Sequence, residues 1–176
     1  PVGHFAPYNL DDEIIEDARN QLIAATRAMQ LDSCAIHADF ILSNGKTYVL
    51  EIGGRSGATC LAELVSIFYG YDYYEKIIRV AIGEKVDFTC DDSEGVPNAS
   101  MLLMSDKDGI IKSQSNNNEE NPDISEIQFD YKPGDAVQAF RVGPHRIGHV
   151  ITKGKSLDDA VELLHKALDN IVIEIE

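Results

Sequence analysis

Apolar residues near the start of the chain recur every three to four positions, which is the spacing of one face of an α-helix. The residues on this face are Ile14, Ala18, Leu22, Ala25 and Met29. Asn9 or Asp11 is placed to cap the first turn. We therefore expect a helix of about five turns that ends near Met29 and packs this face on a sheet.

After this helix the pattern turns to short runs of β-forming residues separated by turn and loop residues. A helical pattern returns near the C-terminus, where Ser156 and Asp159 have the spacing of a capping box. Residues 84–97 have a loop-like composition. The elements expected between the two helices are strands at 34–42 and 47–52, helices at 57–69 and 72–82, and strands at Ala99–Met104, Gly109–Lys112, Ile124–Tyr131, Ala136–Arg141 and Ile147–Thr152.

The order of these elements indicates an α+β fold in which helices pack on an antiparallel sheet. We expect two parts, residues 1–86 and a small α+β region at residues 87–176 that packs on the first. Residues 113–123 contain no apolar side chain, which predicts an exposed, mobile loop between strands. A tolerated insertion explains this loop more simply than a lid over a site, because added loop length costs little free energy.

Composition narrows the classes of function. The formal net charge of −15 argues against nucleic acid and anionic membranes as partners. No apolar run approaches the roughly 20 residues of a membrane span, and we expect a cytoplasmic domain. The three cysteines, Cys34, Cys60 and Cys90, form no metal or redox motif and are expected to be buried, reduced thiols.

Two β-rich runs flanking residues 43–46 hold the candidate chemistry. Each run contains one carboxylate, Asp39 in the first and Glu51 in the second, and Arg55 follows after Gly53-Gly54. Mg²⁺ typically combines one or two carboxylates with substrate phosphates, and an arginine can hold phosphate oxygens through two N–H groups. Glycines let the backbone approach a ligand closely. The pattern therefore suggests a metal–phosphate site, with ordinary surface charge as the alternative.

The register of this hairpin decides whether the two acids cooperate, because side chains alternate faces along a strand. If Asn44-Gly45 is a two-residue turn, Asp39 faces Leu50 and Glu51 lies on the opposite face. If the loop has three residues and its glycine forms a bulge, Asp39 and Glu51 become diagonal neighbours, roughly 7–8 Å apart at Cβ. His37 then opposes Glu51. Both registers are compatible with the local sequence, and only the second builds a site.

The stretches Ile36–Phe40 and Glu51–Ala58, which contain these residues, resemble the C-terminal catalytic part of ATP-grasp enzymes. This family includes biotin carboxylase, carbamoyl phosphate synthetase and the amino-acid and dipeptide ligases. Its pattern places a second acid twelve residues after the first and an arginine four residues later, as this sequence does. The resemblance continues through Asp72–Gly83. The segment Ile147–Ala160 is similar to the amino-acid ligase branch.

The resemblance implies a role for each of these residues. Asp39 and Glu51 would bind Mg²⁺ (or Mn²⁺) carrying the phosphates of ATP. Arg55 would stabilise the transferred phosphoryl group or an acyl phosphate. Many family members have a metal-binding asparagine two residues after the second acid, where this chain has Gly53. The residues implied at the bound nucleotide are Gly53, Gly54 and His37, and a purely structural role is the alternative for the histidine.

The resemblance also implies a larger enzyme, an ATP-dependent ligase that joins a small-molecule carboxylate to an amine. ATP-grasp enzymes hold the nucleotide between two halves, and the N-terminal half supplies phosphate-binding lysines and a glycine-rich loop. We find no such segment before Asp39, so we expect a fragment that hydrolyses no ATP alone. A homodimer is compatible with this reading. The alternative function is a non-catalytic ATP-grasp-like module for binding or assembly.

Overall fold

The chain forms two compact units that interleave along the sequence. The computed structural model describes residues 1–176, apart from the side chain of residue 92. The expected division at residue 86 lies near the return of the chain to unit 1 at Asp91, but two earlier segments also belong to that unit. Unit 1 comprises Pro1–Pro7, Thr59–Tyr71 and Asp91–Glu176, and unit 2 comprises Tyr8–Ala58 and Asp72–Cys90.

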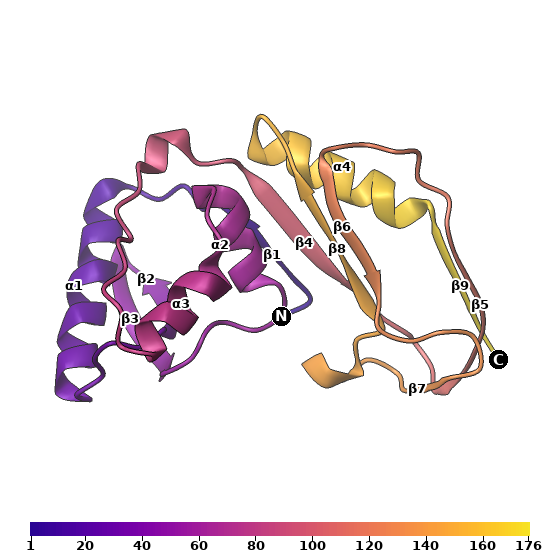
Figure 1. The fold of residues 1–176 in the computed structure, drawn as a ribbon, viewed down its shortest axis with the longest axis horizontal. Coiled ribbons are helices and arrows are strands. Elements are labelled where there is room, and N and C mark those ends of the chain that lie inside the picture. Colours follow the sequence, from indigo (N-terminus) through magenta and orange to yellow (C-terminus); the bar gives the residue numbers. More distant parts are fainter. The chain divides into compact units, whose positions relative to one another are not determined.

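Unit 1 is built on two antiparallel sheets, a four-stranded sheet in the order β1-β4-β8-β6 and a three-stranded sheet in the order β7-β5-β9. Helix α4 packs on the four-stranded sheet, chiefly on β8 and β4 (Figure 1). The strands are β1 (Gly3–Ala6), β4 (Asn98–Leu103), β5 (Gly109–Asn116), β6 (Ile124–Phe129), β7 (Ala136–Val137), β8 (Gly148–Lys153) and β9 (Ile171–Ile175). The helices are α2 (Leu61–Tyr69) and α4 (Leu157–Asp169), with 3₁₀ turns η1 (Asp92–Glu94) and η2 (Gly143–His145).

The core of unit 1 lies on both faces of the four-stranded sheet. Val150 packs with Leu164 of α4, whereas the next residue, Ile151, packs with Cys60 and Leu64 at α2. Because successive strand residues point to opposite faces, the two helices cover opposite sides of the sheet. The expected capping box is present, since the Ser156 side chain accepts a hydrogen bond from the backbone of Asp159 and the Asp159 side chain accepts one in return.

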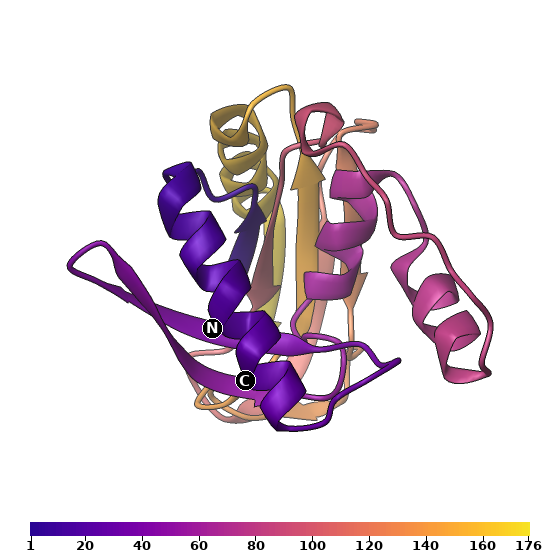
Figure 2. The ribbon, with the colours of Figure 1, turned by 90° about the vertical axis from the view of Figure 1, so that its left-hand side faces the viewer.

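Unit 2 consists of helix α1 (Asp12–Ala28), the hairpin β2 (His37–Ser43) and β3 (Lys46–Gly53), and helix α3 (Tyr73–Ala81). Figure 2 shows α1 lying across the hairpin, and its contacts are with β3. No residue within α1 is fully buried. The hairpin is therefore a thin, open sheet with one helix on it, and much of its surface is exposed.

The α+β class with antiparallel sheets is confirmed, and three details of the expected elements are wrong. Strand β5 continues to Asn116, so residues 113–116 are not loop, because they pair with β9. Strands β1 and β9 were not expected. Strand β7 has two residues instead of six. Among the described residues, no helix has the length and apolar character needed to cross a bilayer.

The cysteines differ from the expectation in their burial. All three are free thiols, but Cys34 and Cys90 are exposed and only Cys60 is buried. Burial raises the pKa of the Cys60 thiol to about 12, and the carboxylate of Glu63 adds to this shift. Cys60 is therefore a protonated core residue at neutral pH and not a nucleophile.

Candidate functional site

The hairpin of unit 2 closes through a two-residue turn. Asn44 and Gly45 have left-handed φ angles of 52° and 73°, and Ser43 pairs with Lys46. Positive φ at both central residues is the geometry of a type I′ turn. Of the two registers that the local sequence allows, the structure therefore has the two-residue turn and not the three-residue loop with a bulge at Gly45. Asparagine and glycine adopt left-handed φ with little strain, which is the local reason for this turn.

A bulge farther along the hairpin nevertheless brings the two acids together. Phe40 pairs with Val49, but the next pair is Asp39 with Glu51, so Leu50 is an extra residue in β3. The bulge shifts the register by one residue, so Asp39, which would face Leu50 without it, pairs directly with Glu51. Directly opposed residues have Cβ atoms about 4.5–5.5 Å apart. The pairing that the site needs is thus reached by a different route from the one expected.

Replacing Gly45 with alanine should lower the free energy of unfolding by about 1 kcal/mol, because a residue with a Cβ is strained at left-handed φ. A Cβ at this position would meet no atom within 4 Å, so the loss comes from the backbone alone. Denaturant unfolding measures the change. Gly143→Ala is the matched control, since its Cβ also meets no atom within 4 Å and its φ is not left-handed. Equal losses in both variants would contradict the turn geometry.

Little positive charge on the described residues lies close enough to offset the negative charge of Asp39 and Glu51. The polar contact of Asp39 among the described residues is with His37, whose Nε2 lies 3.2 Å from its Oδ1. His37 pairs across the hairpin with Gly53, and not with Glu51 as the three-residue loop required. Like charges directly opposite each other weaken strand pairing. A cation between Asp39 and Glu51, both of which are exposed, would remove this repulsion.

Arg55 lies just beyond the end of β3, where Gly53 and Gly54 lead the chain out of the strand. Its side chain lies alongside Gly53, because a Cβ there would sit 3.6 Å from Cγ of Arg55. Its Nη1 donates a 2.8 Å hydrogen bond to the backbone oxygen of Ser56. Arg55 is otherwise exposed, so most of its five N–H donors are free for a ligand. Cβ atoms at both glycines would make only ordinary contacts, so packing alone does not require glycine there.

Helix α1 fixes the hairpin through a polar contact that the sequence did not reveal. Thr47 is buried in β3, and its N–H and hydroxyl both donate to Oδ2 of Asp17, over 2.8 and 2.7 Å. Gln21 donates to the Thr47 carbonyl from the next turn of the helix. The two hydrogen bonds from Thr47, the backbone one more than the hydroxyl one, lower the pKa of the Asp17 carboxyl below its usual 3.8. The only sequence signal was a polar pair four residues apart beside the apolar face.

The described side chains offer no complete metal site by themselves. No group of three or more His, Cys, Asp or Glu residues is placed to hold a metal ion among them. The hairpin therefore contributes at most two carboxylates to a cation. Mg²⁺ commonly uses one or two carboxylates together with phosphate oxygens and water, so the pair fits a cation that arrives with a phosphate ligand.

A family model matches the second half of the chain. Residues 101–176 match the model described as L-amino acid ligase C-terminal domain 2. This matched region lies within unit 1, so it does not include the hairpin. A comparison with curated proteins finds no match.

Solved structures resemble the whole chain. Phosphoribosylglycinamide synthetase from Anaerococcus prevotii is 35% identical, with a TM-score of 0.91 over 100% of this chain and 46% of that protein. L-amino acid ligase from Bacillus licheniformis is 15% identical, with a TM-score of 0.83 over 99% of this chain and 44% of the other. The biotin carboxylase domain of the 2-oxoglutarate carboxylase from Hydrogenobacter thermophilus, in complex with MgADP, ADP and bicarbonate, is 16% identical, with a TM-score of 0.77 over 99% and 39%.

These similarities differ in what they show about this chain. The first covers every residue of the chain at an identity above one third, and it includes the hairpin with both acids. The other two have too little sequence identity to show more than a shared fold. The chain spans less than half the length of each of the three proteins.

Proposed function

We propose, on the premise that this chain belongs to the ATP-grasp family and forms the C-terminal part of its fold, that it supplies the metal- and phosphate-binding residues of an ATP-dependent carboxylate–amine ligase. The observation that carries the proposal is the direct pairing of Asp39 with Glu51, with Arg55 two residues past the end of β3. Two directly opposed carboxylates weaken strand pairing, so a cation-binding role explains them better than surface charge does.

Asp39 and Glu51 would hold Mg²⁺. The ion needs six ligands in near-octahedral geometry, and two carboxylates leave the other positions for ATP phosphates and water. Bound there, it would neutralise negative charge on the phosphates during transfer. That the Hydrogenobacter thermophilus domain was solved with MgADP supports this assignment, because it shares the fold. His37 would hold Asp39 in place through its contact with Oδ1.

Arg55 would act on the phosphoryl group that is transferred. A carboxylate oxygen of the substrate attacks the γ-phosphorus of ATP, the bond to ADP breaks, and an acyl phosphate forms. The amine then attacks the acyl carbon, inorganic phosphate leaves, and the amine nitrogen gives up a proton. Charge builds up on phosphate oxygens in the first step, and a planar guanidinium can donate two N–H groups to them.

An α-amino acid is the carboxylate that we propose. The names of two of the similar proteins, an L-amino acid ligase and a phosphoribosylglycinamide synthetase, both refer to amino-acid groups. Further phosphate-binding residues and much of the substrate pocket would come from the rest of the protein. The amine partner is therefore best found by screening, with glycine as the first carboxylate.

Isotope transfer tests the proposed chemistry directly. The full-length protein is incubated with Mg²⁺, ATP, an amine and glycine labelled with ¹⁸O in its carboxylate. The acyl phosphate route moves one labelled oxygen into inorganic phosphate, because that oxygen bridges carbon and phosphorus and leaves with phosphorus. Label in AMP would show an adenylate instead. Unlabelled phosphate accompanied by product would exclude the acyl phosphate.

A binding module without turnover is the second candidate, and Gly53 favours it. This residue supplies no side-chain ligand, and the hairpin is left with two carboxylates. Such a module would still bind Mg²⁺–nucleotide, but it would release no ADP with any pairing of carboxylate and amine. Calorimetric titration of the full-length protein with MgATP, beside the product assay, separates the two candidates.

A further inference from the structure

Strand β9 lies at the edge of the three-stranded sheet of unit 1, beside β5 (Figure 1). The N–H and carbonyl of Glu176 both bond to Ile110, and the carbonyl of Asn170 accepts a hydrogen bond from Asn117. Successive residues of an antiparallel strand direct these groups to opposite sides, so the even-numbered residues of β9 face β5. The residues whose N–H and carbonyl groups point away from the sheet are Ile171, Ile173 and Ile175. Among the described residues, no strand pairs with this outer edge.

The edge strands of the other sheet of unit 1 carry features that hinder pairing with another chain. Native edge strands commonly have a proline, a bulge or a very short length for this purpose. Strand β1 has four residues and is followed by Pro7, and β6 has a register shift between Ile124 and Glu126. Strand β9 has neither proline nor lysine, and the register shift in its pairing falls between Ile111 and Ser113 of β5. Strand β9 is therefore better suited than β1 or β6 to accept another strand.

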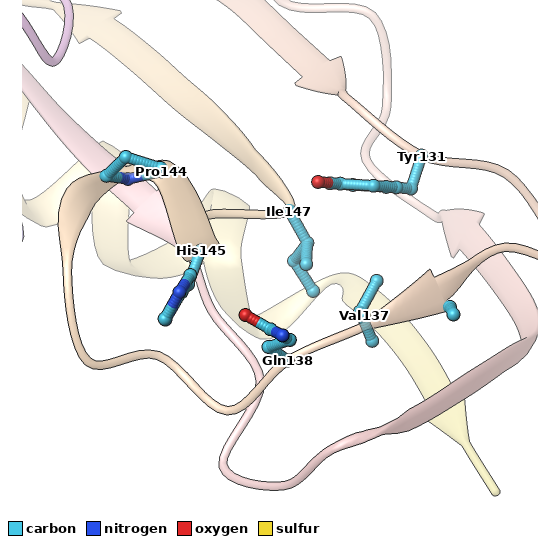
Figure 3. A pocket seen from close by; sticks show the side chains of 7 residues that line it. Tyr131, Val137, Gln138, Pro144, His145 and Ile147 are labelled. Carbon is cyan, nitrogen blue, oxygen red and sulfur yellow. The ribbon is translucent and has the colours of Figure 1, made fainter.

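The opposite edge of the same sheet, at β7, is irregular. This strand has two residues and borders a pocket of about 250 Å³. Figure 3 shows Val137 of β7 and Ile147 at this pocket, with Pro144 and His145 on the loop at its other side. A strand as long as β9 finds no straight edge of its own length there, so association through this sheet has to use β9.

The sequence of β9, Ile-Val-Ile-Glu-Ile, is suited to antiparallel pairing with a second copy of itself. Only odd-numbered residues present backbone groups at the outer edge, so they must lie opposite one another. Centring the pairing on Ile173 matches every residue of the strand and places Val172 opposite Glu174 of the second copy. Every other register that matches the outer groups shortens the pairing, and one of them places the two Glu174 carboxylates directly opposite each other, where like charges repel. The pattern therefore selects the register centred on Ile173.

The carboxylate of Glu174 is held on the side of β5, away from the outer edge. Its Oε2 accepts a 3.0 Å hydrogen bond from Ser113 and lies 3.8 Å from Nζ of Lys112. Val172 is exposed on the same face, and the three isoleucines of the strand pack against the core on the other face. A second copy would thus meet open backbone groups, apolar side chains and a carboxylate that already has partners.

We propose that two copies of the full-length protein associate by antiparallel pairing of their β9 strands about Ile173. Each pair of opposed outward-facing residues would exchange two backbone hydrogen bonds, and the two three-stranded sheets would become one continuous sheet. Both copies use the same edge, so the contact is symmetric and association stops at the dimer. The strand has five residues, and its pairing is small beside the roughly 1,200–2,000 Å² of a stable interface, so the dimer is weak and reversible. The inference is independent of the proposed ligase residues, which lie in unit 2.

Sedimentation velocity of the full-length protein over about a hundredfold concentration range, up to about 0.5 mM, tests the proposal. The wild type should show a reversible monomer–dimer equilibrium. Val172→Glu places a like charge opposite Glu174 at both ends of the symmetric contact and should raise the Kd about two- to thirtyfold. Val172→Lys places an opposite charge there and should leave the Kd unchanged or lower. Val142→Glu, at an exposed loop position of unit 1, is the control and should dimerise as the wild type does.

Hydrogen exchange of the wild type gives a second readout, resolved by residue. The amides of Ile171, Ile173 and Ile175 should exchange quickly in the monomer and slowly in the dimer, because only the dimer gives them acceptors. The amides of Val172 and Glu174 face β5 and should be protected in both states.

Any of the following results would overturn the proposal: a monomer at the highest concentration, a dimer that Val172→Glu does not weaken, a dimer that both Val172 variants weaken equally, or outward-facing amides that are protected in the monomer. The last result would show that another part of the full-length protein covers β9. Thermal unfolding of each variant identifies a loss that arises from misfolding, and hydrogen exchange of the wild type then decides.

Discussion

Replacing Arg55 with alanine in the full-length protein should lower kcat by at least about a thousandfold and leave the fold intact. An arginine that meets the transferred phosphoryl group contributes on the order of 10³–10⁵ to phosphoryl-transfer rates. The side chain is exposed and makes one hydrogen bond, to the Ser56 carbonyl, so little folding energy depends on it. Steady-state kinetics of product formation measures kcat, and a thermal unfolding curve measures the stability of the fold.

Two further variants give the Arg55 experiment its controls. Arg55→Lys keeps the positive charge but loses the planar pair of N–H donors, so its activity should lie between those of the alanine variant and the wild type. Arg27→Ala removes an exposed arginine from the last turn of α1 and should leave kcat unchanged. Wild-type turnover in Arg55→Ala would remove Arg55 from the mechanism. Equal losses for Arg27 and Arg55 would point to net charge instead.

The hairpin separates what local sequence can predict from what it cannot. The Asn44-Gly45 dipeptide is a strong signal for a type I′ turn, and the structure follows it. The bulge at Leu50 has no such signal, because neither this residue nor its neighbours are of a type that requires unusual backbone. The turn and the pairing of the acids are therefore set by separate features of the hairpin. A second irregularity changed the register after the turn had set it.

The missed strands have two different explanations. Strand β9 has the sequence Ile-Val-Ile-Glu-Ile, a β-branched run that local propensity does identify. Residues Ser113–Asn116 are polar and carry no local strand signal, and they are extended because they pair with β9, far away in the sequence. β1 likewise depends on its partner, β4. Strand propensity reflects the neighbouring strand, so the second kind of miss follows from context and not from the pattern.

The contact between α1 and the hairpin was also invisible to pattern reasoning. The apolar face of α1 predicted that the helix packs on a sheet, which is correct, but the specific link is polar. Asp17 accepts two hydrogen bonds from Thr47, one residue past the start of β3. Such a link needs a particular register between helix and strand, which periodicity does not supply. It nevertheless links β3, the strand that contains Glu51, to helix α1.

Replacing Glu51 with glutamine in the full-length protein should raise the Mg²⁺ concentration for half-maximal turnover by at least about tenfold, since one of two proposed ligands loses its charge. The same change should leave thermal stability without Mg²⁺ unchanged or higher, because it removes repulsion from the directly opposed Asp39. Glu51 is the more informative position, as its loss keeps the 3.2 Å contact between His37 and Asp39. Mg²⁺ titration of the turnover rate and thermal unfolding in EDTA give the two readings.

The two readings distinguish a metal site from a structural one. A carboxylate kept for stability would lower the unfolding temperature when neutralised and would leave the Mg²⁺ requirement unchanged. Neutralising a carboxylate kept for metal binding should raise the Mg²⁺ requirement and leave the unfolding temperature unchanged or higher. The reason is that an unoccupied cation site stores repulsion that a bound ion removes. Glu13→Gln, at an exposed carboxylate in the first turn of α1, is the control and should leave the Mg²⁺ requirement unchanged. If Glu51→Gln behaves like a structural residue in both readings, the opposed pair is not a magnesium site.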